Sequence, residues 1–593
     1  MCGLSGLYSK NYVNINKKNL KKILHHRGPD NFQTFEYKKD IYNLMAFNRL
    51  AIIDLNERSN QPYKYKDLIL CFNGEIYNYK KLKLKLERIR VKFDTRSDTE
   101  VLIKYLYHYG INKTLNDIEG MWSFSLFNLK NSKLILCRDY YGEKPLYYLK
   151  KENKFFYGSE ISTLKFYNKK KLEINFDYLM KYLFFEYRAL NANDTLFYKD
   201  IKEVKPGTFL EIDTNFKIKE YKYNKIRNIN KNINYKNFIK KIRKTLFSNF
   251  NECLVSERPL AITLSGGIDS TGIISMIKKN KKINTFTIFS NDKDYDEFKH
   301  VKKTVKKLKL KHNWIHIDKR DFLNNLKKIV SKRHLPLPTL TSYIQWLMYK
   351  EISKKKIKVV LSGNGADEIF SGYYDHFLAQ LNDLKGKDFQ NNFRDWKDKI
   401  SPLIRNKNFK DYLLYKKNYK KMLLGPNLSK KFGKKKFSIK LKDEKIFKSL
   451  LKNRMYNELK YESLPIILQE DDLNAMHFSI ENRSPYLNHN LVKNLQTINT
   501  KFFIKNGYAK KILRDSLKGI APKHVLENHE KIGFNISLNK IVNFNSKKVL
   551  NLLKTNSIIY RIVDKKKILR LFHDKKEINN FQSFVFKFIN AKI

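Results

Sequence analysis

The first group that could do chemistry is a thiol at the second position of the chain, in the stretch MCGLSG. When the initiator methionine is removed ahead of a small residue, Cys2 becomes the first residue and carries a free α-amine. An α-amine has a pKa of about 7.7–8.0 and a thiol one of about 8.5, so this amine can act as general base for its own side chain. The resulting thiolate would attack acyl carbons. A cysteine at this position can also be accidental, so its neighbours must decide.

Three further stretches supply groups that suit a free amino acid with a side-chain amide. In FNGE, the Asn73 amide and the Gly74 N–H could form an oxyanion hole for a tetrahedral intermediate. Arg49, in RLAIIDL, offers a planar fork suited to an α-carboxylate, and Asp98, in RSDTE, suits an ammonium group. The polar turn HHRGPD could cover such a site. Together with the thiol, these groups predict a glutamine site.

A second set of candidate residues follows a short apolar strand, in the stretch LSGGIDS at 264–270. Two adjacent glycines let the backbone approach an anion closely, and Ser265 and Ser270 supply hydroxyl donors at the start of a helix. The stretch lacks the GK[ST] ending of a Walker A loop. It is similar to the PP-loop, SGGxDS, of ATP pyrophosphatases, which cut ATP between the α- and β-phosphates and adenylylate a substrate.

The stretch LSGNGADEIFSGYY at 361–374 also follows a buried strand, so we expect it at the same carboxyl edge of the sheet. Asp367 and Glu368 are candidates to hold Mg²⁺ on the pyrophosphate, because hard cations prefer carboxylate oxygens. Asp296, in YDEF, is a second candidate on the metal side. From the residues alone, Asp296 could equally be a solvated helix N-cap.

The elements that must position these groups follow two patterns. Residues 1–190 read as short strands and turns with a few helices, including a hairpin around NLKNSK, which is an α+β pattern. Between 191 and 240 the periodicity weakens, and KIRNINKNINYKN reads as a linker. From 241 on, short strands alternate with helices, which predicts a parallel, doubly wound sheet. The expected strands are 260–264, 283–289 and 358–361, and the sequence beyond 375 is mostly helical.

Composition narrows the class of protein. The chain has 593 residues, of which 42% are hydrophobic, enough for the packed cores of two to four domains of roughly 100–200 residues each. We find no apolar stretch of about 18 residues and no signal-peptide layout, so we expect neither a membrane span nor export. The four cysteines are scattered without a CxxC pair, which argues against a disulfide scaffold or a zinc site. We therefore expect a cytoplasmic protein.

The formal net charge of +62 has two interpretations. A nucleic-acid-binding protein would be strongly basic, and so would a chain with the lysine, asparagine and isoleucine bias of an AT-rich genome. The lysines are spread along the whole chain, without a zinc finger, an RNA-recognition signature or a basic tail. This distribution favours biased composition, and we do not expect nucleic acid as a partner. The charge should still attract anionic substrates such as ATP.

Taken in order, eleven stretches resemble the glutamine-hydrolysing asparagine synthetase family: MCGLSG, HRGPD, RLAIIDL, FNGEIYNY, RSDTE, RDYYGEKPLYY, GSEISTL, LSGGIDS, LSGNGADEIFSGY, ENRSPYLN and EKIGF. The resemblance implies an αββα Ntn-hydrolase domain, a class II glutaminase, at 1–190. A connecting segment at 191–240 would lead to an α/β PP-loop domain of the adenine nucleotide alpha hydrolase type at 241–593, with a helical C-terminal part. It also implies a homodimer. A basic protein with a degenerate synthetase fold would show gaps in this set, and the sequence contradicts that alternative.

The resemblance implies a reaction in two halves. Cys2 would attack the glutamine amide, releasing ammonia and leaving a glutamyl thioester that water hydrolyses. ATP with Mg²⁺ would activate the β-carboxylate of aspartate as an acyl-adenylate, and ammonia arriving through an internal tunnel would convert it to asparagine and AMP. Relatives of this architecture amidate other carboxylates, including sugar acids of surface polysaccharides, so another acceptor is the alternative. The β-lactam-forming relatives tend to lose the cysteine nucleophile, which this chain keeps.

Residue roles carry over onto matching positions. The implied catalytic residues are Cys2, Asn73 and Gly74 in the glutaminase half and Lys531, in HEKIGF, in the synthetase half, where Lys531 would stabilise charge on the α-phosphate. Asn364 and Arg483 are expected at the synthetase site. Asp296 and Asp367 are expected to hold the metal. The implied glutamine-binding residues are Arg49, Leu50, Ile52, Ile53, Asn73, Gly74, Glu75 and Asp98. The implied ATP-binding residues are Leu264, Ser265, Gly266, Gly267, Asp269, Ser270, Ile288, Ser362 and Gly363.

Three departures from the family pattern lie on the synthetase side. Asn364 stands where family members commonly have an acidic residue, and asparagine cannot take a proton, so a base role there must be absent or served elsewhere. Asn488, in ENRSPYLN, replaces an aspartate, and RHLPLPTLTS lacks an acidic residue before its proline. The positions assigned to the glutaminase half are unaltered, and aspartate remains the expected acceptor.

Overall fold

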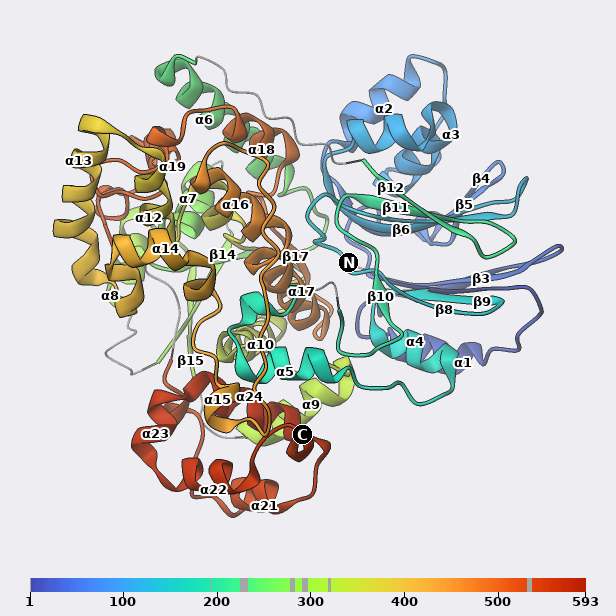
Figure 1. Ribbon diagram of the computed structural model, residues 1–593. Helices are drawn as coiled ribbons and strands as arrows, with labels where there is room; N and C mark the ends of the chain where they lie inside the picture. Colours follow the sequence, from blue (N-terminus) through green and yellow to red (C-terminus); the bar gives the residue numbers. More distant parts are fainter. Residues whose placement is uncertain are drawn as a thin grey trace.

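The computed structural model describes residues 2–192, 195–223, 233–277, 283–290, 297–317, 321–530 and 536–593. The chain has two halves that lie side by side (Figure 1). Two stacked sheets form the N-terminal half, and helices around a parallel sheet form the C-terminal half. Among the described residues, no helix combines the length and the apolar character that crossing a membrane requires.

The N-terminal half contains two six-stranded antiparallel sheets. The first has the order β10 (Lys202–Glu203), β8 (Tyr147–Lys151), β9 (Lys154–Gly158), β1 (Gly3–Ser9), β3 (Tyr42–Arg49) and β2 (Asn31–Lys38). The second has the order β12 (Ile218–Lys222), β11 (Thr208–Ile212), β7 (Lys133–Arg138), β6 (Gly120–Asn128), β5 (Leu68–Ile76) and β4 (Tyr63–Tyr65). The hairpin expected around NLKNSK is the turn between β6 and β7.

Helices cover both outer faces of these sheets, which gives the expected αββα sandwich. In Figure 1, α2 (Tyr79–Glu87) and α3 (Asp98–Asp117) lie above the second sheet, and α1 (Lys17–Ile23) and α4 (Ile161–Asn168) lie below the first. The Ser97 side chain caps α3 by accepting a hydrogen bond from the Thr99 N–H. Apolar side chains of both sheets, such as Phe47 and Phe72, are buried in one shared core.

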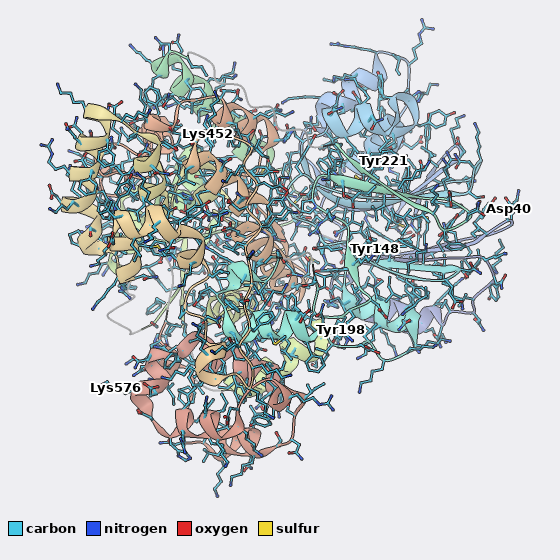
Figure 2. The ribbon with its side chains drawn as sticks, viewed as in Figure 1. Asp40, Tyr148, Tyr198, Tyr221, Lys452 and Lys576 are labelled. Atoms are coloured by element: carbon cyan, nitrogen blue, oxygen red, sulfur yellow. The ribbon has the colours of Figure 1, made fainter. Side chains whose placement is uncertain are left out.

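The boundary between the halves differs from the one expected from the sequence. Helix α5 (Phe176–Phe184) packs on α24 (Gln582–Lys592) at the far end of the chain. Tyr198, labelled at the junction in Figure 2, donates a hydrogen bond to the His334 carbonyl at 3.1 Å. The chain then returns to add β10, β11 and β12 to the N-terminal sheets, so 191–240 is not simply a connecting segment. Of the expected linker KIRNINKNINYKN, residues 225–232 lie outside the described residues.

A five-stranded parallel sheet organises the C-terminal half, as the alternating pattern predicts. Its order is β15 (His312–His316), β14 (Asn284–Phe289), β13 (Leu260–Thr263), β16 (Val359–Leu361) and β17 (Glu481–Arg483). The three strands expected from sequence are β13, β14 and β16. Strands β15 and β17 were not predicted. The sequence of β17, ENR, has no apolar residue that would indicate a buried strand.

Helices surround this sheet and form the rest of the half, as expected. Those next to the sheet and its connections are α6 (Tyr235–Glu252), α7 (Ile268–Met276), α8 (Phe298–Leu308), α9 (Phe322–Arg333), α10 (Leu340–Ser353), α11 (Ala366–Phe370) and α17 (Ser463–Met476). The others are α12 (Tyr374–Asp383), α13 (Gly386–Asp395), α14 (Tyr412–Leu423), α15 (Ser429–Phe432), α16 (Leu450–Lys460), α18 (His489–Gln496), α19 (Lys511–Leu517), α20 (Lys523–Leu526), α21 (Lys547–Lys554), α22 (Lys565–His573) and α23 (Lys575–Asn580).

Candidate active sites

Cys2 lies at the junction of the two halves, because its carbonyl accepts a hydrogen bond from Arg27, which also donates to Asp472 of the C-terminal half. Figure 1 marks the N-terminus at this junction. Cys2 Sγ accepts a hydrogen bond from the Leu50 N–H at 3.4 Å, at the point where β3 ends. The Cys2 N–H donates to Asn73 Oδ1 at 2.8 Å. The side chain is 7% exposed, and burial raises the pKa of the thiol. A thiol held in this way needs a nearby base before it can attack.

Asn73 and Gly74, the residues expected to form an oxyanion hole, lie next to the thiol on β5. Asn73 holds the Cys2 backbone through its oxygen, and its Nδ2 lies 3.4 Å from Ser123 Oγ. A Cβ at Gly74 would lie 2.1 Å from the Met121 carbonyl oxygen, so only glycine allows β5 to approach β6 this closely. The structure therefore places Asn73 against the Cys2 backbone, with Gly74 next to it on β5.

Arg49 is the last residue of β3, and its guanidinium donates hydrogen bonds to the loop that follows. Its Nη1 donates to the Asn56 carbonyl at 2.9 Å and to Asn60 Oδ1 at 2.8 Å, and its Nη2 donates to the Asp54 carbonyl. This loop carries the expected glutamine-binding residues Leu50, Ile52 and Ile53. Binding of an α-carboxylate by Arg49 would therefore replace part of this set of hydrogen bonds.

Negative charge gathers on the other side of the thiol site. Asp98, at the start of α3, is buried and accepts a hydrogen bond from the Ile76 N–H at 2.9 Å. Burial raises the pKa of Asp98 to about 6. Burial, together with the nearby Glu481 and Asp98 carboxylates, also raises the pKa of Glu75. The Arg483 guanidinium, 3.6 Å from Glu75, supplies one positive charge to this cluster, and an ammonium group bound here would add a second.

A cavity of about 500 Å³ opens at the carboxyl edge of the parallel sheet. Its walls come from the loops after β13 and β16, from the ends of β13 and β14, and from α10. It brings together every residue expected at the nucleotide: Leu264, Ser265, Gly266, Gly267, Asp269, Ser270, Ile288, Ser362 and Gly363. Asn364 and Asp367 line the same cavity.

The glycine-rich loop of this cavity is held by its own serines. Ser270 Oγ accepts a hydrogen bond from the Ser265 N–H at 2.9 Å, and the two hydroxyl oxygens lie 3.0 Å apart. Gly267 donates its N–H to Ser265 Oγ at 3.3 Å, and α7 begins directly after it. The first turn of α7 lines the cavity, and the positive end of its dipole suits a phosphate.

Lys510 joins two carboxylates on the wall of the cavity. Its Nζ lies 2.6 Å from both Asp269 oxygens and 2.8 Å from Asp367 Oδ1. Despite burial, which acts in the opposite direction, Asp269 and Asp367 raise the pKa of Lys510. Two carboxylates that already share one cation are a donor set that fits Mg²⁺.

Comparison with known proteins gives a family match in each half of the chain. Residues 1–224 match the glutamine amidotransferase domain, and residues 241–586 match the asparagine synthase family. The chain belongs to the asparagine synthase family. It is an enzyme of the glutamine-hydrolysing asparagine synthetase type, and enzymes of this family use ATP.

Three relatives illustrate what the chain is similar to. The chain is 28% identical over 577 residues to asparagine synthetase [glutamine-hydrolyzing] 1 of Bacillus subtilis, covering 91% of this chain and 87% of the relative. It is 26% identical over 415 residues to asparagine synthetase B of Escherichia coli, covering 65% of this chain and 67% of the relative. It is also 26% identical over 380 residues to an amidase of Gibberella zeae, covering 60% and 55%.

Arg483, expected at the synthetase site, does not line the cavity. Its Nε donates to Glu481 at 2.6 Å, and its Nη1 donates to the Cys253 and Val255 carbonyls at 2.7 Å each. Its Nη2 lies 3.6 Å from Glu75 of the glutaminase half. The structure contradicts the expected position of the Arg483 side chain, because β17 directs it towards Glu75 at the thiol site. Two further expected residues, Asp296 and Lys531, lie outside the described residues.

Two acidic positions of the family pattern are explained by local structure. Glu368 lines the cavity, but its Oε1 accepts hydrogen bonds from the Tyr373 hydroxyl at 2.6 Å and the Ser463 hydroxyl at 2.9 Å. Of the two acidic residues of GADE, it is therefore Asp367 that shares Lys510 with Asp269. Asn488, which replaces an aspartate, accepts a hydrogen bond from the Leu491 N–H and caps α18. Asparagine and aspartate serve equally well as N-caps.

Arg27 of HRGPD, which was not predicted to have a role, contacts the Cys2 backbone. Arg27 Nε donates to the Cys2 carbonyl at 3.0 Å, and its Nη1 donates to Glu160, in GSEISTL, at 3.0 Å and to Asp472 at 2.8 Å. Despite burial, which acts in the opposite direction, His26 and Arg27 hold the pKa of Glu160 well below its usual value. The turn was expected to cover the site, and in the structure its Arg27 links the Cys2 backbone to Glu160 and Asp472. Lys510 was also missed, because nothing in its lysine-rich surroundings marks it.

Proposed function

We propose that the chain is a glutamine-dependent asparagine synthetase that converts aspartate, glutamine, ATP and water to asparagine, glutamate, AMP and pyrophosphate. The observation that carries the proposal is the presence of two sites in one chain. A buried thiol lies among the groups that suit glutamine, and a phosphate-binding loop lines a cavity of about 500 Å³ in the other half.

In the glutaminase half, Cys2 is the nucleophile once Met1 is removed. Its α-amine takes the thiol proton, and the thiolate attacks the glutamine amide carbon. Asn73 and the Gly74 N–H then stabilise the oxyanion. Ammonia leaves, and water hydrolyses the glutamyl thioester to glutamate. Glutamine is held by its α-carboxylate on Arg49, by its ammonium group on Asp98 and Glu75, and by the loop with Leu50, Ile52 and Ile53.

In the synthetase half, the LSGGIDS loop binds the ATP phosphates, Ile288 packs near the adenine, and Ser362 and Gly363 contact the nucleotide. Asp269 and Asp367 would hold Mg²⁺, whose charge neutralises the pyrophosphate leaving group. By resemblance, Asp296 adds a carboxylate on the metal side, and Lys531 stabilises the α-phosphate. The aspartate β-carboxylate attacks the α-phosphorus, and pyrophosphate leaves.

Ammonia connects the two reactions. It attacks the carbonyl carbon of β-aspartyl-adenylate, and AMP leaves with the electron pair of the broken C–O bond. At pH 7 ammonia in water is mostly protonated and loses its nucleophilic electron pair. Passage inside the protein, from the thiol site towards the cavity, keeps it reactive.

Amidation of another carboxylate is the second candidate function. The observation that favours it is Asn364, which lines the cavity at a position where the family pattern has an acidic residue. In addition, one relative carries the name amidase.

One assay separates these two functions. The purified protein is supplied with glutamine, Mg·ATP and aspartate, and AMP, pyrophosphate, glutamate and asparagine are measured. We expect AMP, pyrophosphate and asparagine to form in equal amounts, and only when aspartate is present. If glutamate forms but pyrophosphate does not respond to aspartate, the acceptor is wrong, and a panel of sugar acids replaces aspartate in the same assay.

A further inference from the structure

Asn364 is joined to a buried carboxylate behind the cavity wall. Its Nδ2 donates a hydrogen bond to Asp471 Oδ2 at 2.8 Å. Asn364 lines the cavity, whereas Asp471, in the middle of α17, has no exposed surface. A carboxylate therefore lies one hydrogen bond away from the position where the family pattern has an acidic side chain.

Asp471 accepts hydrogen bonds on both oxygens. The Tyr349 hydroxyl donates to Oδ1 at 2.5 Å and Gln345 Nε2 at 2.7 Å, and Asn482 Nδ2 donates to Oδ2 at 3.1 Å beside Asn364. Burial raises the pKa of Asp471, while hydrogen bonds from Tyr349 and Asn482 act in the opposite direction. Donors to both oxygens favour the ionised form, which can only accept.

This arrangement decides which way the Asn364 amide faces. An amide has one branch that donates and one that accepts, and the two are told apart by their hydrogen-bond partners. Because an ionised Asp471 cannot donate, the NH₂ group of Asn364 must face it. The carbonyl oxygen then occupies the other branch, away from Asp471.

We propose that Asp471 is a positioning residue that locks Asn364 with its carbonyl oxygen towards the reacting nitrogen, and that this pair stands in for the acidic residue absent at position 364. The proposal rests on the proposed function. When ammonia attacks the acyl carbon, a C–N bond forms, the nitrogen becomes positive and the carbonyl oxygen negative. Asn364 accepts a hydrogen bond from that nitrogen, and the charge of Asp471 stabilises it through the amide.

The pair itself takes up no proton. As the tetrahedral intermediate collapses, the C–O bond to AMP breaks and AMP leaves with its electron pair. The nitrogen loses one proton to water or to the departing phosphate. Asn364 orients and polarises the nitrogen in this step, and Asp471 keeps Asn364 in the correct orientation.

The catalytic test exchanges the two side chains. D471N leaves an amide facing an amide, so Asn364 can turn, and we expect the kcat of ammonia-dependent amide formation to fall about 10- to 100-fold. The double variant N364D/D471N moves the carboxylate to the cavity with an amide donor behind it. We expect it to recover most of the lost rate and to acquire an acidic limb in its pH profile, because its carboxylate can be protonated.

Two controls accompany these variants. Glutamate formation from glutamine should remain within about twofold of wild type in all of them, because the thiol site is intact. D383N changes a half-buried carboxylate that accepts hydrogen bonds from the Leu450 and Leu451 N–H groups at the start of α16, outside the cavity lining, and should leave amide formation unchanged. If D471N folds and keeps the wild-type kcat, or if its loss is not recovered by the double variant, the proposal is wrong.

A second test does not depend on the acceptor. N364D alone would place two carboxylates within hydrogen-bonding distance, so we expect its thermal midpoint to fall at pH 8 and to recover towards pH 5. The double variant should unfold near the wild-type midpoint. If the effects of N364D and D471N simply add, the side chains do not interact and the proposal fails. Failure of the proposed function is different: wild-type protein would release no pyrophosphate in response to aspartate, and the rate comparison is then made with the carboxylate that it does use.

Discussion

Arg27 and Asp472 form a buried, two-point ion pair across the junction of the halves. Arg27 Nη1 lies 2.8 Å from Asp472 Oδ2, and Nη2 lies 3.2 Å from Oδ1, with neither side chain exposed. Arg27 also donates to the Cys2 carbonyl, while Asp471, the neighbour of Asp472 on α17, binds Asn364 at the cavity. Two consecutive residues of α17 therefore connect to the two sites, Asp472 to the thiol site through Arg27 and Asp471 to the cavity through Asn364.

The first prediction concerns the strength of this junction. Arg27→Met leaves Asp472 and Glu160 buried without their shared cation, and we expect the free energy of unfolding to fall by about 3 kcal/mol or more. Lys81→Met is the matched control, because Lys81 pairs with Glu252 across the same junction but is exposed. Its effect should stay below about 1 kcal/mol. Urea unfolding followed by tryptophan fluorescence measures both, and equal losses would show that the buried pair adds no more than a surface one.

The second prediction separates the two activities. Cys2→Ala removes the nucleophile, so glutamine hydrolysis and glutamine-dependent asparagine formation should both vanish. Ammonia-dependent asparagine formation should continue at the wild-type rate, because the cavity is untouched. Cys137→Ala, at another buried cysteine, should keep glutamine hydrolysis. Loss of the ammonia-dependent reaction in Cys2→Ala would contradict the assignment of the two halves.

Both candidate sites could be located from the sequence because their signals are local. A strand followed by LSGGIDS and another followed by LSGNGADE place two loops at strand ends, and parallel strands share an edge, so the loops had to meet. The sequence could not show which side chains from distant segments would complete the sites. Lysine is so frequent in this chain that Lys510 carries no signal, although it lies 2.6 Å from Asp269.

There are also physical reasons why strand β17 and the boundary between the halves could not be predicted. β17 is only three polar residues long and forms the edge of the sheet, where its pairing with β16 defines it as a strand. Arg483 was assigned to the synthetase site from its motif, but the strand alternates its side chains and directs this one to the other site. The segment 191–240 lacks a single period because it contains three short strands, β10, β11 and β12, separated by turns.

The third prediction is a pH dependence of glutamine binding. Burial raises the pKa of Asp98 to about 6, so below pH 6 the carboxyl is neutral and no longer attracts the glutamine ammonium. The KM for glutamine should therefore rise as the pH falls through 6. Asp98→Asn should have a high KM that no longer depends on pH in this range. Initial rates of glutamate formation between pH 5 and 8 measure this, and a KM that is flat in wild type would contradict the role of Asp98.

The same pKa fixes the sign of a stability effect. The folded-state pKa of Asp98 lies above its unfolded value of about 3.9, so the folded protein binds this proton more tightly. The contribution of Asp98 therefore stabilises the fold as the pH falls from 6 towards 4 and is lost as the pH rises through 6. Asp98→Asn should remove this part of the pH dependence in thermal unfolding.

The last prediction concerns the carboxylates at the nucleotide. A Cβ at Gly372 would lie 1.8 Å from Asp367 Oδ1 and 2.3 Å from Lys510 Cε, so Gly372→Ala must displace the side chains that we expect to meet Mg·ATP. Aspartate-dependent pyrophosphate release should fall by at least about tenfold, while glutamine hydrolysis stays unchanged. Gly519→Ala controls for general strain: its backbone has φ +81°, which costs alanine about 1–2 kcal/mol, but the added Cβ meets no atom within 4 Å. If both variants lose pyrophosphate release equally, the effect comes from stability, whereas a loss confined to Gly372→Ala places Asp367 and Lys510 in the adenylylation step.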